Sequence, residues 1–122
     1  VMVARFDIAW RKAIQLETLN NRNFYVGGWI RNPKVKVKDF WFLGSPTNIR
    51  KFSEIYDKIE HYCSPEVGAI SKSNGISNHK MAAKHLLNSD FKVETLLQCS
   101  DDFDGEKSDY PLIRYYYFGA EK

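Results

Sequence analysis

Two groups of charged side chains in this sequence could do chemistry, one basic and one acidic. The run KVKVK alternates, so a strand would place Lys34, Lys36 and Lys38 on one side. Phosphate oxygens could accept hydrogen bonds from these three ammonium groups. Lysines in such a row are also typical of an edge strand that is protected against further pairing. The segment 100–109, SDDFDGEKSD, gathers carboxylates that could hold magnesium loosely, although Pro111 stands where a calcium loop needs its twelfth-position glutamate.

Other kinds of reactive site are not indicated. No histidine or cysteine pair has the spacing of a structural zinc site, and the chain has neither a serine-nucleophile elbow nor a catalytic-cysteine signature. A glycine-rich phosphate loop is also missing, so we expect no organic cofactor. The side chains considered for zinc are His61, Cys63, His79, His85 and Cys99.

Charge is distributed unevenly along the chain. Residues 99–122 hold six acidic and three basic side chains, and the whole chain has a net charge of +3, which leaves +6 on residues 1–98. A basic body beside an acidic segment suits contact with nucleic acid, and it suits ordinary solubility equally well. Several aromatic side chains could stack on bases or lie in the core: Trp29, Trp41, Tyr110, Tyr115, Tyr116 and Tyr117.

Length and composition indicate one globular domain over residues 1–122, with 43% hydrophobic and 15% aromatic residues available for a core. No apolar run is long enough to span a membrane, and no signal-peptide pattern is visible. Cys63 and Cys99 do not make a disulfide framework. We therefore expect an intracellular protein, cytoplasmic or nuclear.

The elements that must position these side chains centre on residues 38–63. Residues 39–44 read as a strand buried on both faces, because Phe40, Trp41, Phe42 and Leu43 are consecutive. A helix over 47–62 follows, capped by Ser45 or Thr47 and opened by Pro46.

The remaining pattern predicts a helix over 3–20, whose first few residues could instead be strand, and a strand over 24–31. Gly27-Gly28 suggests a bulge or a close approach to the backbone. A helix over 78–87, a strand over 91–99 and a strand or short helix over 110–118 complete the chain. The expected fold is α+β, a small three- to four-stranded, mostly antiparallel sheet with flanking helices in the order ββα-αβ.

Several short strings resemble the GIY-YIG nuclease superfamily, in particular its phage endonuclease type. Phe24-Tyr25-Val26 resembles the first signature, and Phe42-Leu43-Gly44 resembles the second. The helix start TNIRK over 47–51, the helix–strand stretch 78–99 and the segment 109–112 are also similar, so the resemblance covers about residues 24–115.

The resemblance implies a metal-dependent DNA endonuclease in which Tyr25 assists the nucleophile, Arg50 meets phosphate charge and Tyr56 stands at a position that many members fill with histidine or tyrosine. It also implies that Asp109 or Glu106 holds magnesium. Phe42 and Phe52 depart from the pattern, because members have tyrosine and arginine at these positions. A relative that has lost hydrolysis and kept DNA binding is therefore a second interpretation.

We expect DNA to be the partner, with its backbone contacted by six lysines: Lys34, Lys36, Lys38, Lys51, Lys80 and Lys84. The competing interpretation is a non-enzymatic protein–protein interaction domain, such as a small phage or viral accessory protein that binds through its aromatic C-terminus. The sequence gives no preference for an oligomeric state.

Overall fold

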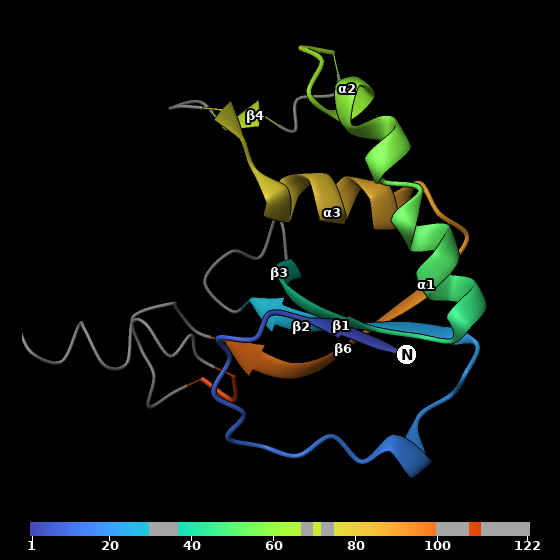
Figure 1. Cartoon of the computed structure of the whole chain (residues 1–122), viewed down its shortest axis with the longest axis vertical. Helices are drawn as coiled ribbons and strands as arrows, with labels where there is room; N and C mark the ends of the chain where they lie inside the picture. Colours follow the sequence, from blue (N-terminus) through green and yellow to red (C-terminus); the bar gives the residue numbers. More distant parts are fainter. Residues whose placement is uncertain (30–36, 67–69, 72–74, 100–107, 111–122) are drawn as a thin grey trace, which may run out of the picture.

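Four strands form the main sheet of this chain, and helices cover one of its faces (Figure 1). The computed structural model describes residues 1–29, 37–66, 70–71, 75–99 and 108–110. In chain order, the elements are β1 (Met2–Ala4), the 3-10 helix η1 (Leu16–Thr18), β2 (Asn23–Trp29), β3 (Val37–Leu43), α1 (Pro46–Ser53), the 3-10 helix η2 (Tyr56–Lys58), α2 (Ile59–Tyr62), β4 (Ile70–Ser71), β5 (Gly75–Ile76), α3 (Asn78–Leu87) and β6 (Lys92–Cys99).

The main sheet has the strand order β1-β3-β2-β6, and β4 and β5 form a separate two-stranded pair. β3 pairs antiparallel with both β1 and β2, whereas β6 lies parallel to β2. The parallel pair requires the chain to cross over, and α1, α2 and α3 make that crossover on one face of the sheet. The predicted α+β fold with a small three- to four-stranded, mostly antiparallel sheet is confirmed, and the sheet includes β1, a strand that the expected order ββα-αβ did not contain.

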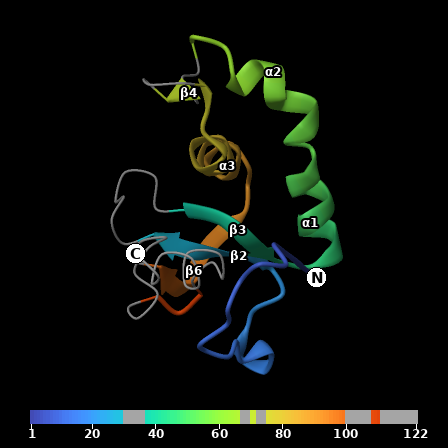
Figure 2. The ribbon, with the colours of Figure 1, turned by 60° about the vertical axis from the view of Figure 1, so that its left-hand side comes forward.

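Different elements pack on the two faces of the sheet. Phe24, Val26 and Phe42 face α1 and α3, and they form a core cluster with Val37, Ala82 and Leu86. Tyr25 and Leu43 face the other way, where they pack with Ile8, Trp41, Cys99 and Tyr110. Figure 2 shows the same division, with the helices on one side of the sheet and the segment before β2 on the other.

The predicted helix over 3–20 is wrong. Residues 2–4 form β1, the alternative that the pattern left open, and only Leu16–Thr18 are helical, in a single 3-10 turn. Tertiary hydrogen bonds replace the helical ones: Arg5 N–H donates to the Phe40 carbonyl and Arg11 N–H to the Asp109 carbonyl. The apolar spacing that suggested a helix instead lets Ile8, Ile14 and Leu19 cover the sheet.

The predicted strand–turn–helix around residue 45 is confirmed at its start and interrupted later. The Ser45 hydroxyl accepts a hydrogen bond from Asn48 N–H, and Pro46 is the first helical residue. The single helix expected over 47–62 is instead divided, because α1 ends at Ser53 and η2 and α2 follow. The Ser53 hydroxyl donates to the Arg50 carbonyl at this break.

The glycine pair in β2 marks both a bulge and a close approach, as the sequence suggested. The β2–β3 register shifts between Val26 and Gly27, and a β-carbon on Gly27 would lie 2.5 Å from the Tyr110 hydroxyl. That hydroxyl donates to the Gly28 carbonyl at 2.5 Å. Gly27 therefore leaves no room for a larger side chain, whereas a β-carbon on Gly28 would meet the end of the Gln98 side chain.

The helix over 78–87 and the strand over 91–99 are confirmed as α3 and β6. The Ser77 hydroxyl accepts a hydrogen bond from Lys80 N–H, so Ser77 caps α3. In β6, Leu97 has a φ of 57°, and the register against β2 shifts at this point. This bulge explains why the alternation of the strand breaks at Leu96-Leu97.

No helix in the described ranges is long and apolar enough to cross a membrane. Cys63 is half-buried and Cys99 is buried, and no disulfide joins these two residues.

Candidate nucleic-acid interface

The residues assigned to a site by the sequence lie in three different parts of the structure. Tyr25, Arg50 and Lys51 lie on elements that meet at one end of the sheet, where β2 and α1 begin. Tyr56, Lys80 and Lys84 belong to the helical layer. Lys38 and Asp109 lie toward the other end, beside the carboxyl end of β2. Lys34, Lys36 and Glu106 fall outside the described residues.

Tyr25 points away from the helical layer, and its hydroxyl is held by the turn before β2. Asn20 N–H donates to the hydroxyl oxygen at 2.7 Å, and Nδ2 of Asn23 lies 3.5 Å from the same atom. The side chain is 4% exposed. Because Tyr56 lies on the other side of the sheet, these two tyrosines do not act at one centre in this structure.

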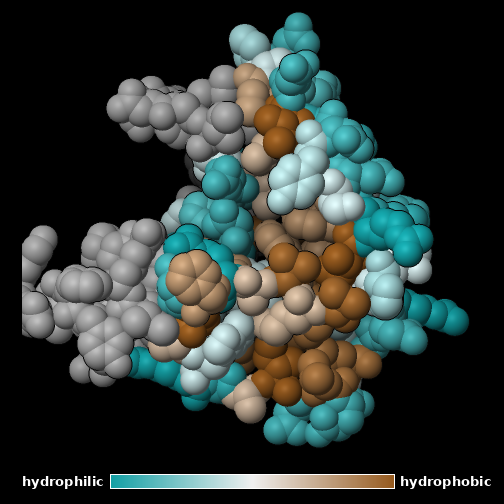
Figure 3. All heavy atoms as spheres, in the orientation of Figure 1, coloured by the Kyte–Doolittle hydropathy of each residue, from teal (hydrophilic) through white to brown (hydrophobic). Residues whose placement is uncertain are grey.

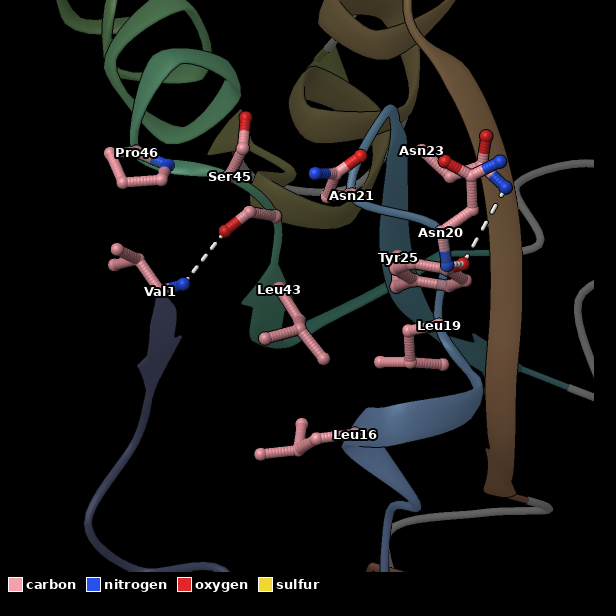
Figure 4. A pocket seen from close by; sticks show the side chains of 11 residues that line it. Val1, Leu16, Leu19, Asn20, Asn21, Asn23, Tyr25, Leu43, Ser45 and Pro46 are labelled. Atoms are coloured by element: carbon pink, nitrogen blue, oxygen red, sulfur yellow. Dashed lines mark hydrogen bonds between the residues drawn. The ribbon is translucent and has the colours of Figure 1, made fainter.

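A pocket of about 310 Å³ opens beside Tyr25. Its polar lining includes Asn20, Asn21, Asn23 and the α-ammonium of Val1, which donates to the Gly44 carbonyl at 2.7 Å, and its apolar lining includes Leu16, Leu19 and Leu43. Figure 4 shows these side chains arranged around one space, with Ser45 and Pro46 at the start of α1 closing its other side. Gly44 permits this junction, since a β-carbon there would lie 3.2 Å from the Phe24 ring.

Basic side chains surround this end of the sheet. Arg22 precedes β2, and its carbonyl accepts a hydrogen bond from Nδ2 of Asn48, which ties it to α1. Lys92 opens β6 at the position that pairs with Asn23. On α1, Arg50 is four residues after Pro46 and so shares its helix face.

The carboxylates near these bases do not neutralise them strongly. Lys51 Nζ lies 3.9 Å from Asp90, and Lys92 Nζ lies 3.6 Å from Glu94. The two lysine side chains are 51% and 74% exposed. Ion pairs this exposed contribute about 0–1 kcal/mol, so an approaching phosphate can replace either carboxylate at little cost.

Comparison with protein-family models, with curated proteins and with solved structures finds no match. The geometry of the pocket and of the basic side chains around it therefore carries the functional argument.

The exposed lysine stripe predicted over 34–38 fails at Lys38, the one member that the structure describes. Lys38 is 1% exposed, and its Nζ lies 4.1 Å from the Trp29 ring centre and 4.9 Å from that of Phe40. Cation–π contacts in the interior therefore take the place of the predicted phosphate contact. The alternation of KVKVK identified the side of the strand, whereas it gave no information about the aromatic rings that cover that side.

Asp109 has a structural partner in β6. Its carboxylate accepts a hydrogen bond from Gln98 N–H at 2.8 Å, and its own N–H donates to the Gln98 carbonyl. Gln98 pairs with Gly28, three residues beyond Tyr25, so Asp109 lies about 10 Å along the sheet from Tyr25. Within the described ranges, no group of three histidine, cysteine or acidic residues could hold a metal ion. The described residues therefore do not form the magnesium site that the resemblance implies.

Tyr56 lines a second cleft, between α3 and the chain from α1 to α2. This cleft has a volume of about 310 Å³, and its walls include Phe42, Phe52, Ile55 and Met81. Tyr56 itself is 74% exposed. Figure 3 shows apolar side chains gathered in the middle of this face, with hydrophilic ones around them. Phe42 and Phe52, which stand where the resemblance expects tyrosine and arginine, are in contact here, with ring centres 4.5 Å apart.

The sequence gave no sign of a pair that joins β3 to α3. Nδ1 of His79 lies 2.7 Å from Oδ1 of Asp39 and 3.1 Å from the Asp39 main-chain nitrogen. One ring nitrogen cannot both donate and accept, and the shorter contact to a carboxylate favours a donating Nδ1–H. Burial raises the pKa of Asp39, but the hydrogen bond and charge of His79 outweigh it, so the pKa lies below its usual value.

Proposed function

We propose that this domain binds DNA at the end of the sheet where β2, β6 and α1 begin, as a GIY-YIG-like protein that no longer cleaves it. One observation carries the proposal: a pocket beside Tyr25, lined by uncharged side chains and by the α-ammonium of Val1, lies at the end of the sheet that carries the exposed basic side chains of Arg22, Arg50, Lys51 and Lys92. The basic side chains are suited to phosphates, and the pocket is suited to a part of the nucleotide that carries no charge.

The arrangement favours binding over hydrolysis. A nuclease of the family needs its tyrosine and its metal-binding carboxylate at one scissile phosphate. Here the Asp109 carboxylate is hydrogen-bonded to the β6 backbone, away from the Tyr25 hydroxyl. Tyr25 is also buried, so a backbone phosphate of a duplex that lies on the protein surface would not reach its hydroxyl directly.

Salt-dependent binding tests the proposal. Fluorescence anisotropy with a labelled oligonucleotide at several salt concentrations between about 50 and 200 mM should give a linear fall of log K with log[salt]. The double variant Lys51→Gln, Lys92→Gln should lower both the affinity and the slope, by about one unit of slope for each phosphate that the protein no longer neutralises. The matched control Lys12→Gln, Lys58→Gln removes the same charge from other parts of the surface and should change the slope much less.

Two results would overturn the proposal. Equal effects of the two double variants would mean that binding follows net charge rather than this surface. Magnesium-dependent nicking of supercoiled plasmid that disappears in Tyr25→Phe would mean that hydrolysis is retained.

The apolar cleft beside Tyr56 favours a second candidate, a protein–protein interaction domain. Its lining of phenylalanine, isoleucine and methionine side chains fits a partner's apolar side chains better than it fits DNA. The aromatic C-terminal segment, which the sequence suggested for the same role, lies outside the described residues. A partner bound by the cleft should remain bound as salt rises, in contrast to DNA.

A further inference from the structure

The hydroxyl of Tyr25 is a buried donor for which the described chain supplies no acceptor. Its oxygen already accepts a hydrogen bond from Asn20 N–H, and a phenol has one proton to give. The nearest side-chain amide, that of Asn23, is 3.5 Å away, which is too long for a good O–H···O bond even with the amide turned over. Buried donors normally have partners, so this proton is available to whatever occupies the adjoining pocket.

The other polar side chains of the pocket are mainly carboxamides. Each of Asn20, Asn21 and Asn23 has a carbonyl oxygen and an NH₂ group side by side. The Asn20 oxygen already accepts a hydrogen bond from Arg22 N–H at 2.9 Å, whereas the Asn21 side chain forms no hydrogen bond within the described ranges. A carboxamide pairs with a ligand edge that presents a donor next to an acceptor. The edges of nucleobases have this arrangement.

The rest of the lining is mainly apolar. Leu16, Leu19, Leu43 and Pro46 provide apolar walls, and none of the described side chains that line the pocket carries a charge. The charged group in the lining is the α-ammonium of Val1, which donates to the Gly44 carbonyl at 2.7 Å. Walls of this kind suit a flat, uncharged ring, and a volume of about 310 Å³ accommodates a heterocyclic base.

We propose that this pocket binds a single unpaired nucleobase, with the Tyr25 hydroxyl donating to an acceptor on the base edge. The inference rests on the proposed function, because Arg22, Arg50 and Lys92 would hold the flanking phosphates outside the pocket. All four bases carry an acceptor, so Tyr25 does not select one base, and because its side chain is only 4% exposed, a base must leave its stack to reach the hydroxyl. The preferred DNA is therefore single-stranded or distorted, with one base turned out of its stack.

The test compares two short single strands of the same length that differ only by one central abasic site. The parent protein should bind the complete strand about 3- to 10-fold more tightly, which is the range expected for one buried hydrogen bond together with the packing of the base. Tyr25→Phe should reduce the preference for the complete strand, because it removes the hydrogen bond and keeps the packing, and it should leave the salt slope unchanged. Ser64→Ala, which also removes one hydroxyl but lies after α2 in the helical layer, is the control and should bind like the parent.

A second variant covers the case in which Tyr25→Phe does not fold. Asn21 is exposed at the rim, so Asn21→Tyr should obstruct the pocket without altering β2. The Asn21→Tyr variant should remove the difference in affinity between the complete and the abasic strand, because a base can no longer enter the pocket. Equal affinity of the parent for both strands, or an undiminished preference in either variant, would overturn the base pocket. Loss of all salt-dependent binding to both strands would instead overturn the proposed function, so the two failures can be told apart.

Discussion

The hydroxyl of Tyr62 lies 2.8 Å from Nδ1 of His85, and this buried contact joins α2 to α3. His85 is 2% exposed, and its Nε2 has no hydrogen-bond partner of good geometry in the described structure. Burial lowers the pKa of His85 and the nearby Lys58 lowers it further, while the carbonyl groups of Phe52 and Lys51 partly oppose both effects. At neutral pH the His85 ring is therefore uncharged, and with its proton on Nε2, toward the carbonyl groups of Phe52 and Lys51, Nδ1 accepts a hydrogen bond from the Tyr62 hydroxyl.

Stability should consequently fall as the pH drops below the ordinary histidine value of 6.5. The unfolded chain binds a proton on His85 there and the folded chain resists it, so the free energy of unfolding rises with pH in this window. Urea titrations from about pH 7 to about pH 5 would measure the slope. His85→Gln should reduce the slope, whereas His61→Gln, at an exposed histidine on α2, should leave it unchanged; equal slopes in all three proteins would contradict the assignment.

The Asp39–His79 pair should stabilise the fold over a different pH range. Because the pKa of Asp39 is lowered in the folded state, its contribution is present above 3.8, the ordinary value, and is lost as the pH falls below it. Asp39→Asn should lower stability by about 1 kcal/mol at neutral pH, since both side chains are only about one quarter exposed. Thermal unfolding at neutral pH and at about pH 3 would show the difference shrink in acid. An unchanged difference in acid would refute this role.

Substitutions of Asp109 test whether its carboxylate stabilises the fold or binds a metal ion. Asp109→Ala removes the acceptor for Gln98 N–H and should cost about 1–3 kcal/mol, because a backbone donor is left without its partner. Asp109→Asn retains an acceptor oxygen and should cost less. If the carboxylate instead holds magnesium, Asn should be as damaging as Ala, and added magnesium should raise the melting temperature of the parent only.

Gly27 should be intolerant of even one methyl group. A β-carbon would lie 2.5 Å from the Tyr110 hydroxyl and 2.9 Å from the Trp41 indole nitrogen, and both side chains are fully buried. Gly27→Ala should therefore cost about 1–3 kcal/mol through overpacking. Gly44→Ala, where the nearest atom would be 3.2 Å away, is the milder comparison. Chemical denaturation of both variants would give the ranking, and a stable Gly27→Ala protein would contradict the packing around Tyr110.

The strand–turn–helix from residue 39 to residue 53 was predictable because its signals are local. Four consecutive apolar residues indicated a strand buried on both faces, and Ser45 with Pro46 indicated where the helix begins. The segment 3–20 was not predictable in this way. Its apolar spacing fits a helix, but pairing with β3 and packing against Tyr25 and Trp41 determine its conformation, and both depend on distant residues.

The candidate site was partly visible in the sequence. Tyr25, Arg50 and Lys51, which the sequence singled out, belong to elements that meet at one end of the sheet. The asparagines at 20, 21 and 23 read only as turn residues, because nothing local shows that a turn will form the wall of a pocket. Lys38 was misjudged because burial by Trp29 and Phe40 is a property of the assembled fold.

The parallel pairing of β2 with β6 has a consequence for the chain as it is synthesised. Residue 23 meets residue 92, so β2 obtains its second neighbour only after the whole helical layer has been made. The hairpin with β3 closes a much shorter loop and should form first. Until β6 emerges, the strand that ends up in the interior of the sheet has one row of backbone N–H and C=O groups open to any extended chain nearby. During translation the risk of mispairing is therefore greatest at β2, and this risk ends when β6 pairs with β2.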